Sequence, residues 1–268
     1  MKRGNVMNGA SSGIAEDWLR VHRRSPAAPL QLACFPHAGG GASFFRRWAD
    51  ILPPEVELVA VQYPGREDRI DDVLIPEIGE LARTAADALR NGVRRRIALF
   101  GHSMGATLAF ETARLLERSG IAVSHLFLSG QTPPHRHRAT DFHLQSDEDL
   151  LDEVRRLAAT PMEIFDIAEI RQLLLPVIRS DYRAIETYRA DDTGRLLCPI
   201  TVMLADADTE VSLDEAGGWA RHSHGRTTIR TFTGSHFYLV ERWRDVVAAI
   251  LADLGCAHPP SSGWPSTP

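Results

Sequence analysis

Short runs of consecutive apolar residues alternate along this chain with longer stretches in which apolar residues recur every three or four positions. The short runs predict buried strands, and the spaced stretches predict amphipathic helices. Strands that alternate with helices form a mostly parallel sheet covered on both faces, so the pattern predicts an α/β fold. The predicted strands cover residues 30–35, 57–63, 96–100, 124–128, 200–204 and 228–232.

The alternation stops between the fourth and fifth of these strands, where the apolar spacing is helical throughout. Residues 146–149 resemble a capping box that begins one helix, and Asp166 begins a second stretch in which Pro176 predicts a kink or break. An insertion at this point of a parallel sheet lies over the carboxyl ends of the strands. We therefore expect residues from about 133 to 196 to form a helical lid that shapes a pocket, besides packing on the sheet.

Length and composition limit the classes of protein to consider. The 268 residues suit one large domain, and 44% hydrophobic and 24% charged residues are ordinary for a globular protein. We expect the domain at residues 29–254, with flexible tails at 1–28 and 255–268. A net charge of −5 gives no reason to expect nucleic acid, and no apolar run approaches the roughly 20 residues that span a membrane.

The cysteines and the start of the chain bear on location. The start lacks the apolar segment of a secretory signal. Three cysteines are an odd number, and without metal-ligand spacing they indicate reduced thiols in a cytoplasmic protein. We expect a monomer that needs no metal and no cofactor.

The third predicted strand ends in Gly101-His102-Ser103-Met104-Gly105, and a helical pattern follows at once. Strand, Gly-x-Ser-x-Gly and helix together predict a nucleophile elbow, in which a sharp turn exposes the serine hydroxyl. Without the strand and the helix, the five-residue pattern would be weak evidence. Ser103 is therefore the candidate nucleophile.

A glycine-rich loop, residues 36–41, follows the first predicted strand and precedes a helix for which Ser43 is the expected N-cap. Upstream of a nucleophile elbow, such a loop can aim a backbone N–H at a substrate oxygen, beside the N–H of the residue after the nucleophile. We assign Ala38 and Met104 as these oxyanion donors. The alternative is a phosphate-binding loop or a simple turn, although the loop lacks the lysine of a P-loop.

A serine nucleophile needs a base, and the base needs an acid that fixes its tautomer. His236 follows the last predicted strand, and acidic residues follow the strand before it, which gives the chain order Ser, Asp, His of an α/β-hydrolase fold. Asp206 and Asp208 compete for the role of the acid. We favour Asp208, because it lies further along the loop that turns towards the histidine.

Several of these segments together resemble the type II thioesterases associated with polyketide synthases and non-ribosomal peptide synthetases. The resemblance extends over about residues 30–254 and rests on 35–40 (FPHAGG), 63–67 (YPGRE), 101–105 (GHSMG), 234–237 (GSHF), 175–182 (LPVIRSDY) and 186–188 (ETY). It implies the same catalytic triad and the same oxyanion donors. Ala205 stands where the family's acid motif usually has glycine, which leaves the choice between the two aspartates open.

The resemblance also implies a function: a discrete hydrolase that removes aberrant or stalled acyl groups from the phosphopantetheine arm of an acyl or peptidyl carrier protein. Such carriers are usually acidic, and Arg46-Arg47 and Arg155-Arg156 could form a basic docking surface, although ordinary solvated helix faces are the simpler interpretation. The triad alone would equally serve a carboxylesterase, a lipase-like hydrolase or an acyltransferase. A carrier-binding module without activity is the alternative of a different class.

Overall fold

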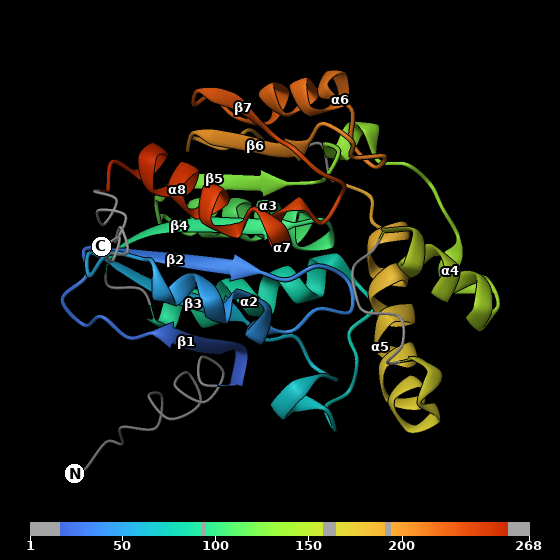
Figure 1. Ribbon diagram of the computed structural model, residues 1–268. Coiled ribbons are helices and arrows are strands. Elements are labelled where there is room, and N and C mark those ends of the chain that lie inside the picture. Colours follow the sequence, from blue (N-terminus) through green and yellow to red (C-terminus); the bar gives the residue numbers. More distant parts are fainter. Residues whose placement is uncertain (1–16, 93–94, 158–164, 191–193, 257–268) are drawn as a thin grey trace, which may run out of the picture.

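The computed structural model describes residues 17–92, 95–157, 165–190 and 194–256. These form a seven-stranded sheet with the strand order β1-β3-β2-β4-β5-β6-β7, shown in Figure 1. All neighbouring strands are parallel except β1 and β3, so the predicted α/β fold with a mostly parallel sheet is confirmed. The strands are β1 Leu19–Arg23, β2 Leu30–Phe35, β3 Val56–Val61, β4 Arg96–His102, β5 Val123–Ser129, β6 Ile200–Ala205 and β7 Thr227–Phe232.

Strand β1 corrects the expectation of a tail over residues 1–28. It pairs antiparallel with β3 at the edge of the sheet, and Trp18 just before it is buried. The sequence concealed this strand because three of its five residues are His or Arg. An edge strand tolerates such residues since one side of it faces solvent. Residues 1–16 and 257–268, the remaining parts of the expected tails, lie outside the described residues.

Helices cover both faces of the sheet, each over its own apolar core. On one face, α2 and α3 pack against the strands, and on the other face the 3₁₀ helix η1 and helix α8 do so. Among the described residues, no helix is long and apolar enough to cross a membrane. The bounds are η1 Ala42–Asp50, η2 Glu67–Arg69, α2 Ile78–Gly92, α3 Met104–Arg118, α6 Leu213–Gly217, η6 Gly218–His222, α7 Tyr238–Glu241 and α8 Trp243–Leu254.

The predicted cap of the first of these helices is wrong. Gly41 is the N-cap of η1, and the hydroxyl of Ser43 donates instead to Glu67, 2.5 Å away. From the local sequence, Gly41 and Ser43 can each be the N-cap of the helix that follows. The competing partner, 24 residues further along the chain, has no local signature.

The segment between β5 and β6 is helical and lies beyond the carboxyl ends of the strands (Figure 1). Its helices have a small apolar core of their own, which includes Leu150, Val154 and Ile178. Helix α5 continues through Pro176, so the break expected there does not occur. Leu175 and Val177, on either side of the proline, are buried. Their packing favours a continuous helix although the proline removes one hydrogen bond. The bounds are η3 Pro134–Arg136, η4 Phe142–Leu144, α4 Asp147–Leu157 and α5 Ala168–Glu186.

The turn from β4 to α3 brings three backbone segments unusually close together. A Cβ added at Gly101 would lie 2.0 Å from the carbonyl oxygen of Gly105, and one added at Gly105 would lie 2.2 Å from that of Phe35. Real Cβ atoms do not approach carbonyl oxygens this closely. The elbow therefore requires glycine at both positions, because only then can α3 begin directly against the end of β2.

We expect Gly105→Ala to lower the free energy of unfolding by at least about 3 kcal/mol, since the displaced atoms are backbone and cannot rotate away. Urea denaturation followed by circular dichroism measures this. Gly217→Ala is the matched control: nothing lies within 4 Å of its added Cβ, and the residue is helical. It should be neutral or stabilise by up to about 1 kcal/mol. Equal stability of the two variants would contradict the packing argument.

Candidate active site

Ser103 lies at the sharpest point of the elbow, with φ 53° and ψ −123°. Among the described residues, it is one of two non-glycine residues with positive φ. Such a conformation costs on the order of 1–3 kcal/mol and persists only where the surroundings impose it. Here the Ser103 N–H donates to the carbonyl of Ser129 on β5 at 2.8 Å, and its own carbonyl accepts from Ala106 at the same distance. The sheet and the helix thus hold the serine in its strained position.

The structure brings Asp208, and not Asp206, to His236. Both carboxylate oxygens of Asp208 lie 3.1 Å from His236 Nδ1, and the Asp208 side chain is fully buried. Asp206 instead accepts a hydrogen bond from the backbone N–H of Gly234 at 3.0 Å, which fixes the loop that carries the histidine. The two aspartates therefore have different roles: one orients the ring, and the other shapes the histidine loop.

Ser103 and His236 line the same pocket, together with Ala38 and Met104. The described residues include no direct hydrogen-bond partner for the Ser103 hydroxyl, which is common for a catalytic serine before substrate binds. The Met104 N–H is free because it belongs to the first turn of α3. The Ala38 N–H likewise has no acceptor within the described residues. Within the described residues, two backbone N–H groups without an acceptor thus belong to residues that line the pocket together with Ser103.

The pocket has a volume of about 490 Å³, within the range of small-molecule sites. The sheet supplies its polar end through Ser103 and His236. Helices η4, α4 and α5, with Phe165 shortly before α5, supply most of its apolar wall. The apolar side chains are Phe142, Val154, Leu157, Phe165, Leu174, Ile178 and Ile185.

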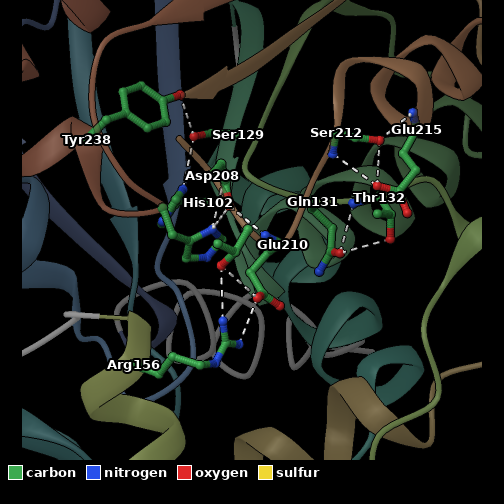
Figure 2. Close-up of polar contacts among 12 residues, drawn as sticks. His102, Ser129, Gln131, Thr132, Arg156, Asp208, Glu210, Ser212, Glu215 and Tyr238 are labelled. Atoms are coloured by element: carbon green, nitrogen blue, oxygen red, sulfur yellow. Dashed lines mark hydrogen bonds and ion pairs between the residues drawn. The ribbon is translucent and has the colours of Figure 1, made fainter. Parts of the chain in front are cut away.

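A buried series of polar side chains that the sequence did not reveal runs from His102 through Ser129 to Tyr238 (Figure 2). The ring centroid of His102 is 4.9 Å from that of His236, and its Nδ1 lies 2.9 Å from Ser129 Oγ. Ser129 Oγ in turn lies 2.8 Å from the hydroxyl of Tyr238. A Cβ at Gly130 would come within 3.0 Å of both histidine rings, so this glycine makes room for the pair. These hydrogen bonds fix the ring of His102, against which the ring of the candidate base His236 packs.

Burial keeps the neighbouring histidines neutral. It lowers the pKa of His37 from 6.5 to about 3, with smaller contributions from the nearby His236 and Arg66. It also lowers the pKa of His102 far below its ordinary value, again helped by His236. A neutral His102 adds no positive charge beside the imidazolium that His236 becomes when it accepts a proton. The rings of His37 and His102 both pack against Phe237.

Arg156 on α4 joins the insertion to the loop that carries Asp208 (Figure 2). Its guanidinium donates to Thr209 Oγ1 at 3.0 Å and to Glu210 at 2.7 Å, and it also pairs with Glu153 on its own helix. This contact could not be predicted from the sequence, because more than 50 residues separate Arg156 from Thr209 and Glu210. The position of α4 is thereby linked to that of the candidate acid.

Two further segments carry closely spaced histidines, His135 and His137 in one and His222 and His224 in the other. His135 Nδ1 lies 2.9 Å from His222 Nε2, so the two segments meet. The described residues contain no group of three or more His, Cys, Asp or Glu side chains placed to hold a metal ion.

Comparison with known proteins points to one family. The family model of the thioesterase domain matches residues 30–254. The chain is 39% identical to the thioesterase PikA5 of Streptomyces venezuelae, over 85% of this chain and 82% of that protein. It is 34% identical to the gramicidin S biosynthesis protein GrsT of Aneurinibacillus migulanus, over 88% and 93%. Its fold is similar to that of BorB, the type II thioesterase from the borrelidin biosynthetic cluster, with a TM-score of 0.81, 41% identity and coverage of 90% and 98%.

The two aspartates give a paired prediction for activity. Asp208→Asn should lower kcat by about 10⁴-fold, since the amide favours the wrong tautomer of His236. Asp206→Asn keeps a side-chain oxygen that can accept from Gly234, so its kcat should fall by less than about tenfold. Steady-state hydrolysis of an activated acyl ester measures both. A larger loss in Asp206→Asn would reverse the assignment of the acid.

The buried histidines give a prediction for stability against pH. Above pH 6.5 neither the folded nor the unfolded chain binds a proton at His37 or His102. As the pH falls from 6.5 towards 3, only the unfolded chain binds protons there, so stability decreases. For His37 the loss should be about 2 kcal/mol between pH 7 and pH 5, and His102 should lower the stability in the same direction. Urea denaturation at both pH values measures the loss.

His37→Gln is the matched variant for this measurement. Because each protein is compared with itself at the two pH values, the substitution's own effect on stability cancels. The variant should lose about 2 kcal/mol less than the wild type between pH 7 and pH 5. An identical loss in both proteins would show that His37 is not neutral in the folded state.

Proposed function

The chain belongs to the thioesterase family, as a type II thioesterase of polyketide and non-ribosomal peptide clusters, and we propose that Ser103, His236 and Asp208 are its catalytic triad. The observation that carries this proposal is the elbow serine beside a buried His–Asp pair in one pocket. The substrate we propose is an aberrant or stalled acyl group on the phosphopantetheine arm of an acyl or peptidyl carrier protein. Removal of such groups would return the carrier to synthesis.

In the acylation step, His236 accepts the proton of the Ser103 hydroxyl while the oxygen attacks the thioester carbonyl. The oxygen of that carbonyl becomes negatively charged, and the N–H groups of Ala38 and Met104 stabilise it. The tetrahedral intermediate then collapses and expels the phosphopantetheine thiolate, which receives the proton from His236. A thiol with a pKa of about 8.5 leaves far more easily than an alcohol does.

In the deacylation step, water takes the place of the departed thiol. His236 removes one of its protons as it attacks the acyl-serine, and the same two backbone donors stabilise the second oxyanion. The acid is released, and Ser103 regains its proton. Asp208 keeps the Nδ1–H of His236 directed towards itself in both steps, so that Nε2 can face the serine.

The insertion shapes the part of the site that receives the acyl chain. Its apolar side chains suit a hydrocarbon substituent, while Glu153, Arg156 and Glu210 bring ionic groups to the same pocket. Arg156 pairs with both glutamates, so the three side chains form one ion-pair network with a net charge of −1. We propose that the pocket accepts short or medium acyl groups with a predominantly apolar chain.

The carrier protein is the proposed partner, because it presents the thioester. Of the two arginine pairs considered for docking, Arg155 and Arg156 are bound by acidic residues of α4 and of the acid loop. Arg47 contacts the carbonyl of Val240 and the ring of Trp243. An ordinary solvated surface is the better description of both pairs. A cytoplasmic location accords with the three free cysteines.

A panel of acyl-phosphopantetheinyl carrier proteins tests the function, with hydrolysis followed by intact-protein mass. The wild type should release acyl groups, and Ser103→Ala should lose at least about 10³-fold in rate while keeping its circular dichroism spectrum. Acyl esters of the same chain length are the control for substrate class. Faster turnover of the esters would indicate a carboxylesterase, and carrier binding with no hydrolysis by the wild type would indicate a module without activity.

A further inference from the structure

Three backbone N–H groups of the oxyanion loop, residues 36–42, donate to acceptors inside the protein. The Gly40 N–H donates to the carbonyl of His37 at 3.0 Å, and the Ala42 N–H donates to Gln62 Oε1 at 2.6 Å. The Gly39 N–H donates to Asp181 Oδ2 at 2.8 Å. Ala38 lies between these bonds, so its neighbours determine where its own N–H points.

Asp181 reaches this loop from helix α5 of the insertion, 142 residues away in the sequence. It also forms a bidentate ion pair with Arg66, with N–O distances of 2.6 and 2.9 Å. The side chains of Arg66 and Asp181 are only 5% and 2% exposed, so both charges are withdrawn from water. The same Arg66 Nη1 donates to the carbonyl of Gly40 at 3.2 Å. The pair therefore binds two peptide groups of the loop, Ala38–Gly39 through its N–H and Gly40–Gly41 through its carbonyl.

Arg66 is itself held firmly. Its Nε donates to the carbonyl of Pro64, and its own carbonyl accepts from Gln62 Nε2 at 3.0 Å. Glu67 next to it is the second non-glycine residue with positive φ in the described part of the chain, at 51°. Backbone strain of this kind concentrates at functional sites. Glu67 also accepts a hydrogen bond from the backbone N–H of Ser43, just beyond the loop.

A buried ion pair is a poor explanation for stability by itself. Removing two charges from water offsets most of their attraction, and apolar side chains of similar size often stabilise a protein equally well. What apolar side chains cannot do is accept a hydrogen bond from Gly39 or donate one to Gly40. The ion pair therefore contributes the hydrogen bonds that fix the backbone geometry of the loop.

We propose that Asp181 and Arg66 are positioning residues that set the oxyanion hole. The Asp181 carboxylate fixes the peptide between Ala38 and Gly39, Arg66 fixes the carbonyl of Gly40, and together they aim the Ala38 N–H at the substrate oxygen. This inference rests on the proposed function, because it assigns a purpose to the oxyanion loop of that mechanism. It also gives the insertion a second role, since α5 completes the catalytic geometry as well as covering the pocket.

The test replaces the whole pair, so that no unpaired charge remains buried. In Arg66→Met/Asp181→Leu the loop loses its support, and kcat should fall about 10²-fold while KM changes less than about threefold. The rate of inactivation by a fluorophosphonate, whose oxygen enters the same hole, should fall in parallel. A double variant that folds and retains the kcat of the wild type would overturn the proposal.

A second double variant separates positioning from a merely structural role. In Arg66→Met/Asp181→Asn the uncharged amide oxygen can still accept from Gly39, so kcat should recover at least about tenfold relative to the Leu variant. Arg66→Lys, which keeps the charge and loses the bidentate geometry, covers the case in which neither double variant folds. Its kcat should fall by a larger factor than the factor by which its KM changes. Equal kcat in the Asn and Leu variants, or an unchanged kcat in Arg66→Lys, would contradict the proposal.

The matched control is another Arg–Asp pair, Arg230 and Asp253, which joins β7 to α8 away from the pocket. Arg230→Met/Asp253→Leu should leave kcat within about twofold of the wild type. The wild type and Ser103→Ala decide the proposed function separately. If fluorophosphonate fails to label Ser103 in the wild type, the proposed function fails. If it labels the wild type and the Arg66→Met/Asp181→Leu variant at the same rate, only the present inference fails.

Discussion

The site depends on one close approach of backbone atoms, at the point where β4 turns into α3. Gly101 and Gly105 allow the first turn of α3 to lie directly against the end of β2. This contact forces Ser103 into its strained conformation and, in the same step, brings the oxyanion loop beside it. Main-chain packing thus places Ser103 beside the oxyanion loop. Side chains hold that loop, as Asp181 and Arg66 do, and shape the pocket.

The helical insertion contributes more than a cover. Arg156 on α4 holds the loop that carries Asp208, and Asp181 on α5 holds the oxyanion loop. The insertion thereby contacts both polar ends of the site, while its apolar side chains line the space between them. Burial lowers the pKa of His37 and of His102, so both rings near His236 stay neutral, while the Asp208 carboxylate lies against His236 Nδ1.

Much of this arrangement could be predicted from the sequence, because it is encoded locally. Six strands follow from apolar runs, and the elbow follows from two glycines between a strand and a helix. The ends at which parallel strands meet bring His236 to an aspartate after β6, although the choice of Asp208 over Asp206 stayed open until the structure paired it with the histidine. Strand β1 was missed because an edge strand rich in Arg and His resembles a loop. The pair of Arg66 and Asp181 was out of reach, since nothing near either residue identifies a partner 115 positions away. One hint was present: Asp181 interrupts the apolar face of α5 that includes Ile178.

The bond between Asp181 and the oxyanion loop affects how the protein could be re-engineered. Exchanging the insertion between relatives is an obvious way to alter the range of acyl groups accepted, since it lines most of the pocket. A transplanted α5 would have to bring an aspartate into register with Gly39 and meet an arginine that belongs to the recipient. Grafts that join before α5 would leave this contact intact. The first half of the insertion carries Arg156, whose contacts with Thr209 and Glu210 would have to be kept as well. Both halves of the insertion therefore couple the range of acyl groups to the geometry of the site.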